Sequence, residues 1–427
     1  MVREGKSFGG AGAAILTMFA LFFMIAFVTN FAGSMGVIVK NQFGASNTAS
    51  QLGSAANFAA YFFMGIPGGL ILRRRGYRFT ALLAAAVGFA GLLVQLVSGY
   101  VESFAVYVTG AFVAGFSMCL LNLVVNPLLN TLGGGGNRGN QLVQFGCSLN
   151  SVGATVAPAL LGCLIGGEVA KARVADAAPA LMIALGIFAA AFAVVFLSRI
   201  PEPHKETTEE RTARPAGGVS VWRDVLATLR FRHFAFGALA ILLYVAIETG
   251  IPNMANLYMT AENTPASVGA VVAGAVVALY WLGMLVGRLA GAALGSRVSS
   301  RTMVSACAAV AIACMLAIIL SPERLVTVCS KTVPASMCLL PVCGLCTSVM
   351  WGGLFNLSTE GLGKYVPMGA GIYMTMVVGG LLLPVQGMIA DRVGILGSYW
   401  LTAAMFVYVL VYALVLSRPK EGNAQEH

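Results

Sequence analysis

The stretch PEPHKETTEERTARPAGG, residues 201–218, is the centre of the longest polar segment in a chain of 427 residues. Outside this segment the chain is strongly apolar. Of all residues, 58% are hydrophobic and only 10% are charged, whereas an ordinary soluble domain has roughly 25% charged residues. This composition, with a mean hydropathy of +0.85, argues against a soluble globular enzyme and indicates a protein that crosses a membrane many times.

Apolar stretches recur on both sides of the polar segment, and each is long enough to cross a hydrocarbon core of about 30 Å as a helix. The start MVREGKSFGG has no small-residue cleavage site after a short apolar core, so we expect the first span to be retained. The predicted fold class is an all-α polytopic membrane protein with twelve transmembrane helices. The predicted spans are residues 11–37, 48–72, 79–98, 104–131, 140–166, 178–198, 233–259, 266–290, 300–320, 333–358, 367–390 and 396–417.

The polar segment divides these spans six and six. We therefore predict an N-terminal six-helix half at residues 1–198, a cytoplasmic linker at 199–232, and a C-terminal six-helix half at 233–427 that ends in a short cytoplasmic tail. Short basic loops follow the second span of each half, which indicates an internal repeat. Two pseudo-symmetric six-helix halves are the plan of the major facilitator fold.

Basic residues are distributed unevenly between the loops. With a cytoplasmic amino terminus, the cytoplasmic loops and ends hold 20 of the 26 Lys and Arg residues. Cytoplasmic loops of membrane proteins carry such an excess. We therefore expect both termini on the cytoplasmic side of a bacterial inner membrane. Membrane topology also explains the net charge of +10 better than a nucleic-acid partner does.

Two short motifs are interpreted as structural. Cys343 and Cys346 form a C-x-x-C inside an apolar span with no nearby His or second pair, so we interpret them as core residues rather than a zinc or redox site. The run LGGGGNRGN at residues 132–140 lacks the Gly-Lys-Ser/Thr ending of a P-loop and is expected to be a tight loop. We therefore expect no cofactor, no metal and no catalytic residue.

Polar side chains inside the spans are candidate functional residues, because a polar group in hydrocarbon is costly unless it faces a cavity or a partner. Asn and Gln amides both donate and accept hydrogen bonds, as sugar hydroxyls do. The alternative for each is a hydrogen bond that joins two helices. The candidate substrate-binding residues are Asn30, Asn122, Asn126, Gln144, Asn150, Glu248, Asn253, Trp351 and Asn356.

Glu248 differs from the other acidic residues, nearly all of which are in loops or tails. It lies inside the span 233–259, beside Gly250 and Pro252, and such residues weaken a helix in a way that suits a binding or gating segment. A buried carboxylate can take up a proton, bind a cation or accept hydrogen bonds. Glu248 is therefore the candidate for ion coupling. Arg288, near the end of span 266–290, is interpreted as an anchor at the cytoplasmic interface.

The motifs of the chain, taken in order, closely resemble a known family. They include NTASQLGSAANFAAYFFMGIPGGLILRRRGYR at 47–78, LYVAIETG at 243–250, YWLGMLVGRLAG at 280–291, and the segments at 115–154, 355–365 and 377–394. This pattern resembles the sugar-symporter family of the major facilitator superfamily that includes bacterial fucose permease and the glucose/galactose transporters. The resemblance covers nearly the whole chain.

The resemblance implies a sugar site to which Asn30, Asn150 and Glu248 contribute. It also implies a difference in the proton mechanism. Fucose permease has carboxylates at the positions aligned with Gly33 and Asn122, and neither of these residues can titrate. Glu248 is then the remaining intramembrane carboxylate.

The predicted function is secondary active import of a hexose or amino sugar by alternating access, coupled to H+ or Na+. We expect a monomer in the lipid bilayer, with a small-molecule sugar and a coupling cation as its partners. Three alternatives remain open: an uncoupled sugar facilitator, a small-molecule exporter of the same fold, and a receptor that signals without turnover. The absence of a further soluble domain argues against the receptor.

Overall fold

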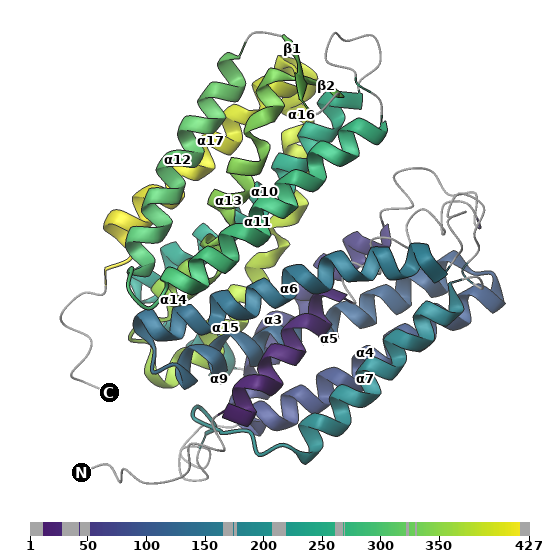
Figure 1. Ribbon diagram of the computed structural model, residues 1–427. Coiled ribbons are helices and arrows are strands. Elements are labelled where there is room, and N and C mark those ends of the chain that lie inside the picture. Colours follow the sequence, from purple (N-terminus) through teal and green to yellow (C-terminus); the bar gives the residue numbers. More distant parts are fainter. Residues whose placement is uncertain are drawn as a thin grey trace. The chain divides into compact units, whose positions relative to one another are not determined.

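The computed structural model is helical at each of the twelve predicted spans, because every span overlaps at least one helix (Figure 1). Asn30 and Gly33 lie outside the described residues. The structure describes residues 12–27, 42, 52–164, 174, 177–206, 219–260, 268, 270–321, 324–328 and 331–418.

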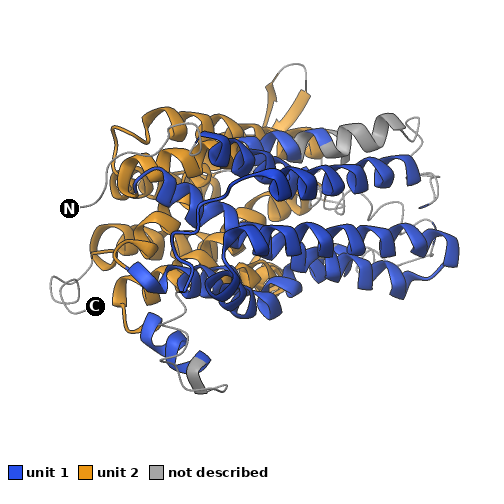
Figure 2. Ribbon diagram, turned by 90° about the horizontal axis from the view of Figure 1, so that it is seen from below, with its two compact units in different colours: residues 1–134, 149–228, 362–375 blue, residues 135–148, 229–361, 376–427 orange. Residues whose placement is uncertain are grey.

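The chain forms two compact units (Figure 2). Unit 1 comprises residues 1–134, 149–228 and 362–375. It contains the later part of α6 and all but the last residue of α9. The helices of unit 1 are Gly12–Phe27, α3 (Leu52–Arg75), α4 (Tyr77–Val101), α5 (Phe104–Leu132), α6 (Gly136–Leu164), α7 (Ala178–Leu197), α9 (Val219–Leu229), η2 (Gly363–Tyr365) and α15 (Val366–Thr375).

Unit 2 comprises residues 135–148, 229–361 and 376–427, and therefore includes the start of α6. Its other elements are α10 (Arg232–Thr260), α11 (Ala270–Leu294), α12 (Ser300–Leu320), β1 (Leu325–Val328), β2 (Lys331–Pro334), η1 (Ala335–Leu339), α13 (Leu340–Ser348), α14 (Met350–Thr359), η3 (Met376–Leu382), α16 (Leu383–Val393), α17 (Ile395–Val411) and the π-helix η4 (Tyr412–Leu416). The predicted boundaries of the two halves, with a linker at 199–232, stay a prediction.

Ten helical segments among the described residues are long and apolar enough to cross a membrane. The helix Gly12–Phe27 is apolar but shorter. Helix α6 carries the polar side chains of Asn140, Gln144 and Asn150 among its 29 residues. A span this polar must turn these side chains toward protein or a cavity rather than toward lipid.

Two elements were not predicted from the sequence. Helix α9 lies inside the polar segment expected to be a linker. A β-hairpin, β1 paired antiparallel with β2, follows the predicted ninth span and overlaps the start of the tenth, with Leu325 opposite Pro334 and Val328 opposite Lys331. Val and Thr dominate both strands, and such β-branched residues favour strands. The tenth predicted span therefore begins as a strand, and its helical part starts at Ala335.

Helices α3 and α15 of unit 1 pack against each other through glycines. A Cβ atom added at Gly371 would lie 2.7 Å from the carbonyl oxygen of Gly65, and one added at Gly69 would lie 2.7 Å from the carbonyl oxygen of Pro367. These distances are too short for any side chain. Small residues let helix backbones approach closely in membrane proteins, so the three glycines bring α15 directly against α3.

The first residues of the polar segment cap α4. The Glu202 carboxylate accepts hydrogen bonds from the backbone N–H groups of Tyr77 and Arg78, the latter at 3.0 Å. A carboxylate at a helix N-terminus satisfies otherwise unpaired N–H groups and interacts favourably with the helix dipole. The Tyr77 hydroxyl lies 2.7 Å from Nδ1 of His204, and burial lowers the pKa of the His204 imidazole below its usual value. His204 is therefore neutral at pH 7.

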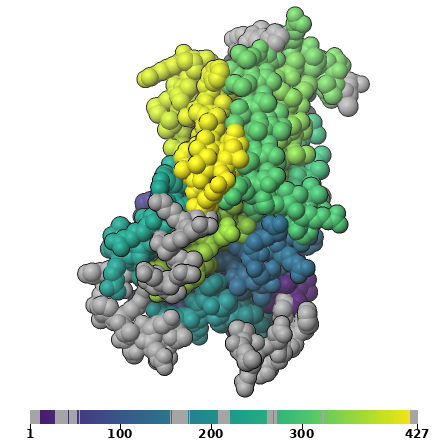
Figure 3. Space-filling model, turned by 90° about the vertical axis from the view of Figure 1, so that its left-hand side faces the viewer, coloured from purple at the N-terminus to yellow at the C-terminus, as the bar shows by residue number. Residues whose placement is uncertain are grey.

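Helix α10 is the central helix of unit 2, and it packs against α11, α14, α17 and η3. Its buried side chains include Phe234, Ile241, Tyr244 and Ile251. Helices α12 and α17 pack side by side on the outside of the unit, as the green and yellow surfaces of Figure 3 show. Residues on α10 are thus enclosed on several sides by unit 2.

Candidate functional site

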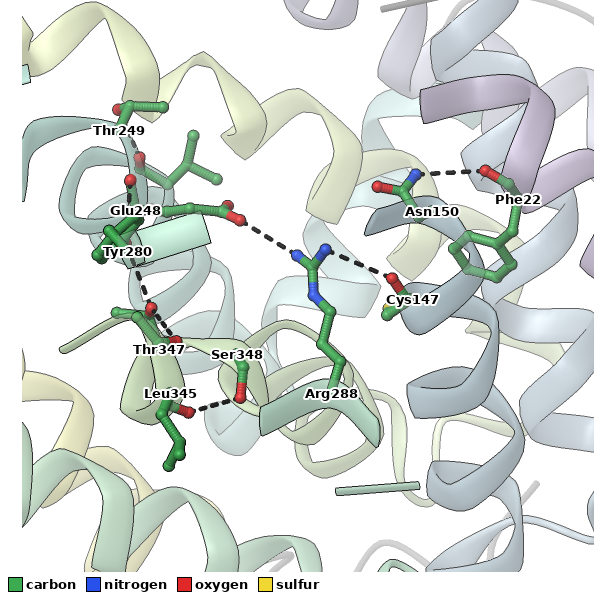
Figure 4. A network of polar contacts seen from close by, with 12 residues as sticks. Phe22, Cys147, Asn150, Glu248, Thr249, Tyr280, Arg288, Leu345, Thr347 and Ser348 are labelled. Atoms are coloured by element: carbon green, nitrogen blue, oxygen red, sulfur yellow. Dashed lines mark hydrogen bonds and ion pairs between the residues drawn. The ribbon is translucent and has the colours of Figure 1, made fainter. Parts of the chain in front are cut away.

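A buried ion pair joins α10 and α11 in unit 2. Nη2 of Arg288 lies 3.2 Å from Oε1 of Glu248, and the two side chains are 10% and 18% exposed. Nη1 of Arg288 donates a second, longer hydrogen bond to the carbonyl oxygen of Cys147 on α6, at 3.4 Å (Figure 4). The guanidinium therefore connects three helices of the unit. Charges this deep in a protein are rare unless they are paired.

A proline four residues after Glu248 on α10 explains why the hydroxyl of another residue bonds to the backbone carbonyl of Glu248. In a regular helix the N–H of residue 252 would donate to the carbonyl oxygen of Glu248, but Pro252 has no N–H. The hydroxyl of Tyr280, on α11, donates to that carbonyl instead, at 3.2 Å. The same hydroxyl lies 3.2 Å from Oγ1 of Thr347 on α13. Tyr280 thus stabilises the helix at the residue that carries the buried charge (Figure 4).

Replacing Tyr280 by phenylalanine is expected to lower the free energy of unfolding by about 1–3 kcal/mol, because the carbonyl of Glu248 then has no donor in a buried site. The matched control is Tyr408→Phe, since the Tyr408 hydroxyl donates to the carbonyl of Phe236 at 3.1 Å, and no proline removes the helical donor to that carbonyl. The control is expected to cost about 0.6 kcal/mol, a typical value for hydrogen bonds between membrane helices. Thermal unfolding of the purified variants measures both, and equal losses would contradict the role given to Pro252.

Aromatic rings lie beside the ion pair. The Tyr244 ring, one helical turn before Glu248 on α10, lies 6.3 Å from the Trp351 ring on α14, measured between centroids and with a tilt of 54°. The Tyr244 hydroxyl is buried and makes no hydrogen bond of ordinary geometry within the described residues. A carboxylate, a guanidinium and aromatic rings together provide hydrogen-bonding groups and an apolar surface, which are the features of small-molecule sites.

The ion pair has two possible chemical states. With both groups charged, their attraction offsets part of the cost of burying them. If the carboxylate takes up a proton, the attraction is lost and the guanidinium keeps only its other hydrogen bonds. A ligand that binds either partner also competes with the pair. Among the described residues, no group of three or more His, Cys, Asp or Glu side chains is arranged to hold a metal ion.

The predicted amides of unit 1 bond mainly to their own neighbourhood. Nδ2 of Asn122 donates to the Tyr61 hydroxyl at 3.0 Å, and Nδ2 of Asn126 donates to the backbone and side-chain oxygens of Asn122 at 2.9 and 3.2 Å. Asn150 makes a longer and weaker hydrogen bond than these two residues. Its Nδ2 reaches the carbonyl oxygen of Phe22 only at 3.4 Å, and the side chain is partly exposed. Asn150 therefore gives up less hydrogen-bond energy than Asn122 or Asn126 when its amide turns from the protein to a ligand.

The other predicted residues differ in their surroundings. Gln144 donates to the carbonyl of Val349 at 2.8 Å within unit 2, and Asn356 donates to Oγ of Ser300 at 2.9 Å, which joins α14 to α12. Asn253 is exposed. Trp351 lies beside Tyr244, while Asn30 is outside the described residues. Within unit 2, Glu248 is thus a member of the ion pair, Trp351 lies beside Tyr244, and Asn356 makes a separate contact.

Arg288 corrects an interpretation from the sequence. It was expected to anchor its helix at the cytoplasmic interface, but it is 8% exposed and pairs with Glu248. The predicted span ended at residue 290, whereas α11 continues to Leu294. At 1.5 Å per residue, Arg288 lies about 9 Å from the helix end. The signal in the sequence was the uncharged stretch LAGAAL at residues 289–294, which indicates that the helix continues past Arg288.

Comparison with known proteins gives the family. The model of the Major Facilitator Superfamily matches residues 17–383. The chain belongs to this superfamily of membrane transporters. It is 28% identical over 419 residues to a protein of Brucella abortus named glucose/galactose transporter, with 97% of each chain covered. It is 21% identical over 420 residues to the L-fucose-proton symporter of Escherichia coli, with 92% of this chain and 91% of the symporter covered.

Solved structures of superfamily members agree with the fold. The superfamily transporter FucP in the outward conformation matches with a TM-score of 0.80 at 19% identity, covering 93% of this chain and 97% of that chain. The proton:xylose symporter XylE matches with a TM-score of 0.68 at 12% identity, covering 96% and 95%. The predicted fold class, an all-α polytopic membrane protein with the major facilitator fold, is thereby confirmed.

Proposed function

We propose that this superfamily member is a secondary active importer of a hexose or amino sugar that works by alternating access. The observation that carries the proposal is the buried pair of Glu248 and Arg288 on adjacent helices. A transporter that only needed a stable bundle would gain little from burying two charges, since apolar residues of similar size pack at least as well. The similarity to transporters named for glucose and galactose supports a hexose as the substrate.

We propose H+ rather than Na+ as the coupling ion. A sodium ion at Glu248 would lie close to the guanidinium of Arg288 and would be repelled by it. A proton neutralises the carboxylate that it binds and releases the guanidinium to bond elsewhere. The similarity to proteins named L-fucose-proton symporter and proton:xylose symporter is in keeping with this choice.

The sugar is proposed to bind through amides and rings. Asn150 and Glu248 are the proposed hydrogen-bonding residues, with Asn30 as a further candidate. Trp351, beside Tyr244, is proposed to pack against the apolar face of a sugar ring. The protein is proposed to act as a monomer in the inner membrane of a bacterium, with both termini in the cytoplasm.

Transport by purified protein in liposomes tests this function. We expect uptake of one hexose or amino sugar above its equilibrium level when an inward proton gradient is imposed, and no such effect of a sodium gradient. Uptake that only equilibrates the sugar would favour the facilitator. Competition by apolar compounds but by no sugar would favour the exporter.

Replacing Asn150 by alanine is expected to weaken sugar binding about five- to tenfold, because one hydrogen bond to a hydroxyl is worth about 1 kcal/mol or slightly more. The matched control is Gln386→Ala, whose amide donates to Oγ1 of Thr402 at 3.1 Å inside unit 2. The control is expected to lower the melting temperature without changing the sugar affinity. Titration of binding by calorimetry, with monodispersity checked for each variant, measures the effect. An unchanged affinity in folded Asn150→Ala would assign the residue to helix packing.

A further inference from the structure

Helix α9, in the polar segment between α7 and α10, has two different faces. Asp224, Val225 and Thr228 are buried, whereas Trp222 and Leu226 are 66% and 61% exposed. Trp222 and Leu226 are four residues apart and therefore lie on one side of the helix, opposite Asp224 and Thr228. A large aromatic ring and a leucine thus project away from the protein.

The buried face fixes the orientation of this helix. Oδ2 of Asp224 accepts a hydrogen bond from Nη1 of Arg73 at 3.1 Å, and the same guanidinium lies 3.5 Å from Glu206. Arg73 belongs to the last turn of α3, a membrane span. The pair ties one side of α9 to the end of α3, so the exposed side with Trp222 is held in a defined direction.

The position of α9 along the chain places it at the membrane surface. The helix ends at Leu229, and the membrane span α10 begins at Arg232. Three residue steps cover at most about 11 Å, so the end of α9 lies within about 11 Å of the first residue of the span. A helix that ends so close to a span and exposes Trp and Leu has the form of an interfacial helix. Trp is also enriched at this depth.

The charges beside the exposed apolar side chains are basic. Arg223, next to Trp222, is exposed, and so is Arg230, which directly follows the last residue of α9. The acidic Asp224 is on the buried face and is paired with Arg73. Arginine pairs well with phosphate groups, and basic residues near a membrane surface are attracted to anionic lipids.

We propose that α9 is an interfacial helix that binds anionic phospholipid, with Trp222 and Leu226 inserted at the level of the headgroups and Arg223 and Arg230 on lipid phosphates. The lipid covers the face of α9 that the protein leaves exposed. The Asp224–Arg73 pair on the opposite face connects the lipid-bound helix to the end of α3. This binding is independent of the transported substrate and of the coupling ion.

Hydrogen–deuterium exchange of the full-length transporter in nanodiscs tests the proposal. The amides of residues 219–230 are expected to exchange more slowly as phosphatidylglycerol is added to phosphatidylcholine. In Arg223→Gln/Arg230→Gln, the protection is expected to require more phosphatidylglycerol, by about fivefold for each arginine removed. In Trp222→Ser/Leu226→Ser, these amides are expected to exchange faster whether or not phosphatidylglycerol is present.

The matched control is Arg324→Gln/Lys331→Gln, which removes two exposed basic residues at the β-hairpin and is expected to behave as wild type. Equal exchange of α9 in the presence and absence of phosphatidylglycerol would overturn the proposal. So would the same protection from inorganic phosphate in phosphatidylcholine nanodiscs, or an equal loss of protection in the control variant. None of these outcomes depends on transport, so they are separate from a failure of the proposed function.

Discussion

Replacing Glu248 by glutamine is expected to abolish accumulation of sugar against its gradient while sugar exchange across the membrane continues. Glutamine keeps the shape of the side chain and an oxygen that accepts a hydrogen bond from Arg288, but it cannot take up a proton. If the carboxylate couples the proton to the sugar, the variant still binds and reorients, but it no longer uses the gradient. Counterflow and gradient-driven uptake in the same proteoliposomes measure the two activities.

The control for this variant is Glu360→Gln, which changes an exposed carboxylate at the end of α14. It is expected to accumulate sugar as the wild type does. A parallel fall of exchange and accumulation in Glu248→Gln would mean that Glu248 binds sugar without coupling the proton. Wild-type accumulation in Glu248→Gln, with the same dependence on the proton gradient, would leave Glu248 with a structural role only.

Replacing Arg288 by glutamine is expected to lower the free energy of unfolding by roughly 3 kcal/mol. Breaking a buried pair by removing one partner leaves the other charge without compensation, which typically costs 3–5 kcal/mol. The lower end of the range applies because the Glu248 side chain is 18% exposed. The change also removes the hydrogen bond to the carbonyl of Cys147. Thermal unfolding of the detergent-solubilised protein measures the loss.

The double variant Glu248→Gln/Arg288→Gln separates the pair from its members. Two neutral side chains leave no buried charge without a counter-charge, and replacing both partners of a buried pair is often close to neutral. We therefore expect the double variant to recover most of the stability that Arg288→Gln loses. If the double variant loses as much free energy of unfolding as the two single variants together, the residues are not energetically coupled. The ion pair then has no role in either protonation state.

The helical spans could be predicted because they follow from local composition. About twenty apolar residues without charge can satisfy their backbone groups in lipid only as a helix, so each span is recognisable without knowledge of its neighbours. Local composition also misled at α9 and at the β-hairpin. The polar sequence around α9 indicated a linker, because the contact that orders this helix, Asp224 with Arg73, comes from a distant part of the chain. The hairpin was missed although its β-branched residues favour strands, because it overlaps the start of an apolar stretch that was assigned to a span.

The candidate site was only partly predictable. Glu248 was recognised from the sequence, since an acidic residue in an apolar span is unusual in any context. Its partner was not, because Arg288 is 40 residues away and lies near the predicted end of its span. The amides show the same limit. A spacing of four residues places Asn122 and Asn126 on one face of α5, but it could not show that Asn126 bonds to Asn122 and that Asn122 bonds to Tyr61.

The sequence by itself determined that this protein is a bundle of membrane helices with one intramembrane glutamate and a polar segment near its middle. It also determined that Pro252 leaves the carbonyl of Glu248 without its helical donor. Only the tertiary structure decided that Tyr280 supplies the donor and that Arg288 supplies the counter-charge. The physical reason is that hydrophobicity fixes which residues enter the membrane, whereas the rotation and packing of each helix fix which side chains meet.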